Sequence, residues 1–221
     1  MQLRALKLSL FSNTDPDCSE KSFNVTYESV TTRRSLWSVE GNVTCNDDYY
    51  QLLAHVTCLG NGSWTPPSPR CQKRLWRYPE TLLISDQVSF PIPGTVMEGW
   101  SMCVEGVPTK SSKVQLQIDK GSFYNVTVHT SWLFDCGCVV INDKVNGSWG
   151  TPQNVWNPPF PLKAGKPFFF RLTVNTSTTV NIYMDNTLYY THNLKFSLSS
   201  FTRMFIQFDV NLTKVESWCK V

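Results

Sequence analysis

Hydrophobic and polar residues alternate in several short stretches of the last two thirds of the chain. Each stretch is rich in β-branched and aromatic residues and is bounded by Gly, Pro, Asn or Asp. The stretches cover residues 112–118, 124–129, 138–142, 168–174, 179–184 and 204–210. Alternation with a period of two is typical of half-buried strands, and no window of eleven or more residues has the period of an amphipathic helix. Short strands about ten residues apart predict an antiparallel β-sandwich.

The first third of the chain differs from the rest in its cysteine content. Four of the eight cysteines lie there, at spacings of 27, 13 and 13 residues. They are Cys18, Cys45, Cys58 and Cys71. A Gly-x-Trp ending at Trp64 follows the third cysteine, and a proline stands two residues before the fourth. This arrangement resembles a sushi (complement control protein) module.

The sushi resemblance implies how these cysteines pair, whereas their spacing alone leaves three pairings open. The first would join the third and the second the fourth, giving Cys18–Cys58 and Cys45–Cys71. The resemblance also implies a buried Trp64 with Tyr27 or Phe23 beside it. About 55 residues close too small a core by themselves, so two disulfides and one tryptophan have to compensate.

Three further segments show a second resemblance. They are Val128–Phe134 with Val139–Asn142, Asn146–Gly150 with Pro159–Phe168, and the closing stretch of Val180–Asn186, Tyr189–His192 and Phe208–Val215. Asn142 stands seven residues before a Trp-Gly, and a Phe-Pro-x-x-x-Gly-x-Pro-Phe follows. This succession resembles a galectin carbohydrate-recognition domain, which implies a jelly-roll β-sandwich. We therefore expect an all-β chain with an N-terminal segment 1–15, a sushi-like module 16–73, a linker 74–77 and a galectin-like sandwich 78–221.

The galectin resemblance also implies a sugar site, in which a Trp stacks on galactose while a His, two Asn, two Arg and a Glu bind its hydroxyls. Trp149, Asn142 and His129 match three of these ligands. The expected second Asn is replaced by Ser131. The first Arg is replaced by Leu133, and the acidic and second basic positions fall in Thr151–Asn154, which has no charge. The neutral substitutes that could still bind or stack are Gln153, Asn154, Trp132 and Trp156.

The loss of charged ligands has a predictable cost. A hydrogen bond to a charged group contributes about 1.5–3 kcal/mol, and a millimolar-to-micromolar affinity amounts to about 4–8 kcal/mol. We therefore expect a lectin with weakened or altered glycan specificity and no lactose binding tighter than about 1 mM. The alternative is a pair of protein-binding modules that uses the galectin fold as a scaffold, since a fold does not decide function.

Composition narrows the function further. The net charge is only +3, without a basic stripe, which argues against nucleic-acid binding. No run approaches the roughly 18 apolar residues of a membrane span. No Ser-His-Asp order, nucleotide-binding glycine loop or carboxylate pair stands out, and three histidines limit acid–base chemistry. We expect neither an enzyme nor a bound cofactor.

Seven Asn-x-Ser/Thr sequons and an even number of cysteines favour the secretory pathway. The sequons begin at Asn24, Asn42, Asn61, Asn125, Asn146, Asn175 and Asn211. Charges interrupt the apolar residues of the first eleven positions too often for a good signal-peptide core. We expect a protein that is secreted or displayed on the cell surface, with glycans or glycoproteins as partners.

The last four cysteines lie in the galectin-like part. In the galectin arrangement the strand of Cys103 runs antiparallel beside the final strand, which carries Cys219, so facing Cα atoms lie about 4.5–5.5 Å apart. We predict a Cys103–Cys219 disulfide. Cys136 and Cys138 pair either with each other or with other cysteines, including those of a second chain. A zinc site needs four ligands, and this C-x-C with one nearby histidine supplies too few.

Overall fold

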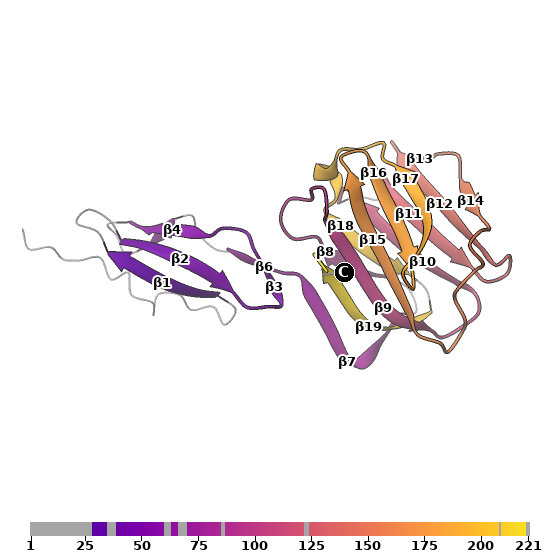
Figure 1. Ribbon diagram of the computed structural model, residues 1–221, viewed down its shortest axis with the longest axis horizontal. Helices are drawn as coiled ribbons and strands as arrows, with labels where there is room; N and C mark the ends of the chain where they lie inside the picture. The colour runs from indigo at the N-terminus through magenta and orange to yellow at the C-terminus, as the bar shows by residue number, and fades with distance from the viewer. Residues whose placement is uncertain are drawn as a thin grey trace, which may run out of the picture. The chain divides into compact units, whose positions relative to one another are not determined.

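The computed structural model describes residues 28–34, 39–59, 63–65, 70–84, 87–121, 124–207 and 209–219. The chain divides into two compact units. The first comprises Met1–Asn46 and Gln51–Cys71, and the second comprises Asp47–Tyr50 and Gln72–Val221. All regular elements of the described residues are strands, apart from the single 3₁₀ turn Leu198–Ser200 (Figure 1).

The first unit contains an antiparallel sheet in the order β1-β2-β4-β5. Its strands are β1 (Glu28–Arg34), β2 (Val39–Cys45), β4 (His55–Cys58) and β5 (Trp64–Thr65). Alternate residues of β2 are buried, as a sheet with one covered face requires. The short strands β3 (Tyr49–Gln51) and β6 (Cys71–Lys73) form a separate two-stranded sheet.

Trp64 is buried in the first unit, as predicted. A Cβ atom on Gly41 would lie 2.5 Å from Val30 and 3.1 Å from the Trp64 ring, so glycine leaves the space that the ring needs. The predicted Cys45–Cys71 disulfide is present, with Cα atoms 5.8 Å apart. Cys58 is also disulfide-bonded. Its expected partner Cys18 and the expected neighbours Tyr27 and Phe23 lie outside the described residues.

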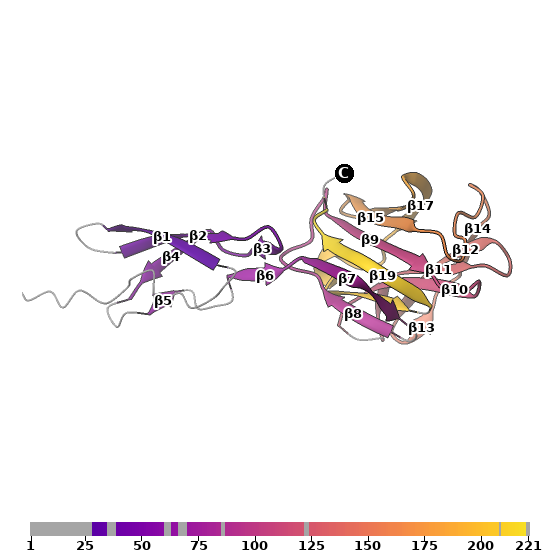
Figure 2. The same cartoon turned by 90° about the horizontal axis from the view of Figure 1, so that it is seen from below.

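The second unit is a sandwich of two antiparallel sheets. One sheet has the order β13-β12-β11-β10-β18-β8, with β14 also paired to β12, and the other has the order β17-β16-β15-β9-β19-β7 (Figures 1 and 2). The strands of the first sheet are β8 (Gln87–Pro91), β10 (Lys113–Asp119), β11 (Val126–Leu133), β12 (Cys138–Val145), β13 (Ser148–Trp149), β14 (Gln153–Val155) and β18 (Arg203–Gln207). Those of the second are β7 (Leu75–Ile84), β9 (Ser101–Pro108), β15 (Phe168–Thr176), β16 (Thr179–Met184), β17 (Thr187–Asn193) and β19 (Val210–Ser217).

The core lies between these two sheets and is formed by every second residue of their strands. Its largest fully buried side chains include Trp100, Trp132 and Phe170. Trp132 meets Phe170 edge to face across the core, with ring centroids 6.2 Å apart. Because the alternate residues of β10, β11 and β12 face this core, the residues between them point to the outer face of the first sheet.

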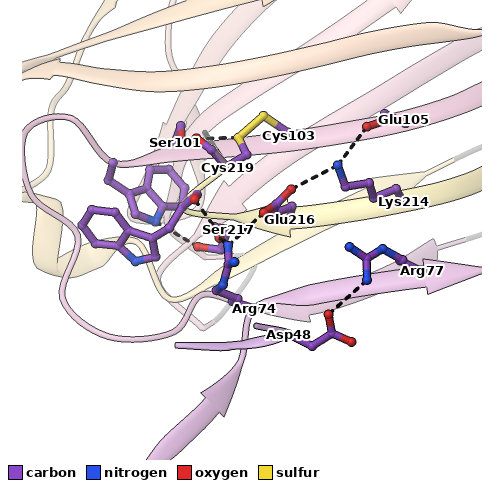
Figure 3. Close-up of polar contacts among 12 residues, drawn as sticks. Asp48, Arg74, Arg77, Ser101, Cys103, Glu105, Lys214, Glu216, Ser217 and Cys219 are labelled. Carbon is purple, nitrogen blue, oxygen red and sulfur yellow. Dashed lines mark hydrogen bonds and ion pairs between the residues drawn. A yellow bond between two sulfur atoms is a disulfide. The ribbon is translucent and has the colours of Figure 1, made fainter. Parts of the chain in front are cut away.

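The end of the last strand is fastened by the predicted disulfide between Cys103 of β9 and Cys219 (Figure 3). Their Cα atoms are 6.1 Å apart. The Ser101 hydroxyl donates a hydrogen bond to the Cys219 carbonyl at 2.7 Å. Strand β9 runs antiparallel to β19, as the galectin resemblance implied.

Two stretches of the second unit differ from the expectations. Leu75–Arg77, which the sequence suggested as part of a linker, open β7 and pair with β19. The alternating stretch 204–210 was expected to form one strand, but it is divided between the two sheets. Strand β18 ends at Gln207, and β19 begins at Val210. Asp209 marks the division, with a φ of 27° and a carboxylate that accepts hydrogen bonds from Lys110 and Ser112.

Candidate functional site

The outer face of β10, β11 and β12 presents a row of polar side chains. His129 of β11 lies between Gln117 of β10 and Asn142 of β12 in the antiparallel register. Ser131 lies one pair further along, next to Gln115. Residues that face each other across antiparallel strands share one face of the sheet, so these five side chains form one surface.

A chain of hydrogen bonds connects four of these side chains. Gln115 Nε2 donates to Ser131 Oγ at 2.6 Å, and the Ser131 hydroxyl is 2.9 Å from His129 Nε2. His129 Nδ1 is 3.3 Å from Gln117 Oε1. Because the Gln117 oxygen can only accept, His129 carries its proton on Nδ1 and accepts from Ser131 on Nε2. Gln117 Nε2 is buried without a hydrogen-bond partner among the described residues.

His129 is therefore held as a neutral ring. Burial, with a smaller contribution from the positive charge of Lys113, lowers the pKa of His129 from 6.5 to about 4. The surface around His129 thus offers neutral donors and acceptors at physiological pH, which suit hydroxyl groups rather than ionic groups.

Trp149 borders this row. It lies on β13 opposite Lys144 of β12, and 49% of its surface is exposed. The Trp149 ring centroid is 5.0 Å from that of His129, and Lys144 Nζ lies 5.4 Å from the Trp149 centroid. The two-residue turn of this hairpin is Asn146-Gly147, with φ angles of 50° and 81°. These values match a type I′ turn, for which Asn-Gly is the preferred sequence.

Both polar atoms of the Asn142 side chain form hydrogen bonds with nearby backbone groups. Its Nδ2 donates to the Gly150 carbonyl at 3.1 Å, and its Oδ1 accepts from the Asp143 backbone at 2.9 Å. Asp143 itself is buried and binds Lys195 Nζ at 2.8 Å. These contacts shape the loop that follows Trp149, because a side chain at Gly150 would collide with Asp143.

The structure separates the neighbouring residues Gln153 and Asn154. Asn154 pairs with Val140 and so shares the outer face with Ser131, whereas Gln153 pairs with Ile141 of the core-facing set. Gln153 lines a polar pocket of about 260 Å³ at the edge of the sandwich, together with Asp143, Tyr190, His192 and Lys195. Asn142 lines the same pocket, so Gln153 meets the row around His129 only at its Asn142 end.

Trp132 does not supply a second stacking wall, because it is fully buried in the core. Trp156 is 60% exposed.

Cys136 and Cys138 form a disulfide with each other. Within the described ranges, no group of three or more His, Cys, Asp or Glu side chains is placed to hold a metal ion. No described helix has the length and hydrophobicity that crossing a bilayer requires.

Comparison with known proteins identifies this sandwich. Residues 87–217 match the model of the galactoside-binding lectins. The chain belongs to the galectin family. A bovine relative, galectin-4, is 32% identical over 96 residues, which represent 41% of this chain and 29% of that protein. The chain thus matches less than a third of the length of this relative.

Solved galectin structures show the same fold. Galectin LEC-6 of Caenorhabditis elegans is 17% identical, with a TM-score of 0.53, and the match covers 65% of this chain and 95% of that one. A double variant of human galectin-16 is 18% identical, with a TM-score of 0.55, over 62% and 97% of the two chains. The sheet that carries His129, Asn142 and Trp149 is therefore part of a galectin sandwich.

Strand β10 contributes two residues to the row that the sequence did not predict. Gln115 and Gln117 hold Ser131 and His129, yet neither stands in a recognisable motif. Their positions in the alternating run 112–118 mark them as outward-facing, but only the pairing of β10 with β11 brings them to these partners. Lys144 likewise reaches Trp149 only through the hairpin.

Proposed function

We propose that this galectin is an extracellular recognition glycoprotein whose lectin domain binds glycans through the outer face of β10–β12 with weakened or altered specificity. The observation that carries the proposal is the half-exposed Trp149 beside the neutral row around His129. An aromatic face and fixed neutral donors and acceptors are the groups that bind sugar rings and hydroxyls. The first unit acts as a sushi-like spacer or docking module.

Altered specificity is proposed because the charged ligands of the family motif have neutral counterparts here. Leu133, Pro152 and Asn154 stand at the positions of the two Arg and the Glu. The remaining neutral hydrogen bonds contribute about 0.5–1.5 kcal/mol each, compared with about 1.5–3 kcal/mol for charged ones. Affinity for lactose is accordingly weaker than about 1 mM.

The extracellular location is supported by covalent features. Cys45–Cys71, Cys103–Cys219 and Cys136–Cys138 are disulfide pairs, which persist in oxidising compartments. Seven sequons along the chain fit a protein that passes through the secretory pathway. Glycans and glycoproteins at cell surfaces are the partners that this location makes available.

The proposal is tested with the full chain by calorimetric titration of lactose and by a glycan array. We expect no lactose affinity in the micromolar range and retention of a restricted set of glycans. Trp149→Ala should abolish that retention, and Leu188→Ala, which removes a similarly exposed apolar side chain of β17 in the opposite sheet, should not. Micromolar lactose binding would refute the altered specificity. An array without any bound glycan would favour the protein-binding scaffold instead.

A further inference from the structure

The hairpin that presents Trp149 also carries a sequon. Asn146, Gly147 and Ser148 form an Asn-Gly-Ser sequence at the turn between β12 and β13, and all three are exposed. Asn146 lies two residues beyond the Lys144–Trp149 pair, which places it about 7 Å further along the hairpin axis. No hydrogen bond of the Asn146 side chain is present among the described residues, so its amide nitrogen is open to modification.

The turn is held in place from the side of β11. The Asn146 backbone N–H donates to Asn125 Oδ1 at 2.8 Å, and the Gly147 N–H donates to the Tyr124 carbonyl at 2.8 Å. The Tyr124 ring lies so close to Gly147 that a Cβ atom there would be only 2.9 Å away. A group attached to Asn146 therefore starts from a fixed point next to Trp149.

The other described sequons lack this relationship to the row around His129. Asn175 is exposed at the end of β15, in the opposite sheet, and Asn42 is exposed in the first unit. Asn211 is half-buried in β19, between β9 and β7. Asn125 is half-buried, and its side-chain oxygen is bound to the Asn146 turn. Asn146 thus combines exposure with proximity to Trp149.

We propose that Asn146 carries an N-linked glycan that shields Trp149 and lowers the access of external glycans to the outer face of β10–β12. This inference rests on the proposed extracellular location, because N-glycans are added in the secretory pathway. An N-glycan is bulky and hydrophilic, and here it would start about 7 Å along the hairpin axis from the Lys144–Trp149 pair. Removal of the glycan then exposes the lectin site.

Ser148 allows a matched test, because the sequon needs a hydroxyl at this position while the Asn-Gly turn does not. The full chain is secreted from eukaryotic cells as wild type, Ser148→Ala and Ser148→Thr, and glycopeptide mapping reports the occupancy of each sequon. Asn175→Gln controls for a glycan on the opposite sheet. Hydroxyl-radical footprinting then measures the oxidation of Trp149, with the exposed Trp156 as the internal reference.

We expect a glycan at Asn146 in the wild type and in Ser148→Thr, and its loss in Ser148→Ala. Oxidation of Trp149 relative to Trp156 should rise severalfold in Ser148→Ala and stay unchanged in the other two variants. Occupied sequons elsewhere with an unmodified Asn146, or equal oxidation of Trp149 in all chains, would overturn this inference alone. A secreted chain without any glycan would overturn it together with the proposed extracellular glycoprotein. The readout needs no sugar ligand, so it is independent of whether the lectin site binds one.

Discussion

His129 and Trp149 lie against each other on the outer face of the sheet, with ring centroids 5.0 Å apart and planes inclined by 58°. His129 is oriented by Ser131 and Gln117, and Trp149 is placed by the hairpin that follows β12. The position of the Trp149 ring therefore depends on the polar row, because the His129 ring packs against it.

The neutral state of His129 predicts a pH dependence of stability. The unfolded chain binds a proton at the ordinary histidine pKa of 6.5, whereas the folded chain binds it only near 4. The contribution of His129 to the free energy of unfolding is therefore complete above 6.5 and is lost as the pH falls from 6.5 to about 4. The loss amounts to about 3 kcal/mol.

Urea denaturation at several pH values checks this prediction. His192 also has a pKa lowered by burial, despite the opposing effect of Asp143, so the comparison has to be with His129→Gln. We expect the free energy of unfolding of the wild type to fall more steeply than that of His129→Gln between pH 6.5 and 4. Parallel curves would contradict a neutral, buried His129.

Restoring the charged ligands of the family motif should create lactose binding. The combined variant Leu133→Arg, Pro152→Glu and Asn154→Arg places charges beside the row around His129, since Leu133 and Asn154 pair with outward-facing residues of β12. Each restored charged hydrogen bond is worth about 1.5–3 kcal/mol, which corresponds to at least tenfold in affinity. Calorimetric titration with lactose measures the gain. An unchanged affinity would show that the backbone of this face no longer fits galactose.

The two disulfides of the galectin domain should differ in their effect on stability. Cys103 and Cys219 are 116 residues apart, so their bond removes about 4–5 kcal/mol of loop entropy from the unfolded chain. Cys136 and Cys138 are only two residues apart, and the same model gives them less than about 2 kcal/mol. Urea denaturation of the double variants Cys103→Ala/Cys219→Ala and Cys136→Ala/Cys138→Ala checks this order. Equal losses would refute the entropic account.

The ion pair between Arg74 and Glu216 should stabilise the galectin domain. Arg74 Nη1 lies 2.8 Å from Glu216 Oε1, and the two side chains are only 20% and 13% exposed (Figure 3). Burial alone would lower the pKa of Lys214, but its hydrogen bonds to Glu216 and Glu105 outweigh this effect and raise it. Arg74→Ala leaves a largely buried carboxylate with Lys214 only, and we expect a loss of about 1–3 kcal/mol in the free energy of unfolding.

Arg77→Ala is the matched control for Arg74→Ala. Arg77 pairs with Asp48 at 3.1 Å, but the two side chains are 65% and 43% exposed. Exposed pairs are worth less than about 1 kcal/mol. Thermal or urea denaturation should rank Arg74→Ala well below Arg77→Ala in stability. The reverse order would show that Arg74 does not support β7 and β19.

The alternating runs 112–118, 138–142, 168–174 and 179–184 correspond closely to β10, β12, β15 and β16. A period of two identifies a strand because it reflects the local geometry of extended backbone. The pairing of Cys103 with Cys219 also followed from the strand order that the galectin resemblance implied. Of the candidate site, His129, Ser131, Asn142, Trp149 and Asn154 do share one face or border it.

Other properties depend on which strands lie next to one another. Periodicity does not reveal that the run 204–210 changes sheets at Asp209, because the carboxylate that fixes this turn binds Lys110 and Ser112 from another part of the chain. The galectin resemblance likewise made Trp132 and Gln153 candidates, but the structure buries Trp132 in the core and places Gln153 at the polar pocket at the edge of the sandwich.

The sequence by itself indicated most strands of the sandwich, because a period of two depends only on local backbone geometry. Its motifs also showed the galectin resemblance, which implied the Cys103–Cys219 pair. Only the tertiary structure showed that Gln115 and Gln117 hold Ser131 and His129, and that Arg74 pairs with Glu216 of the last strand. These contacts join residues far apart in the chain, and their formation requires the complete sheet register and the burial that comes with it.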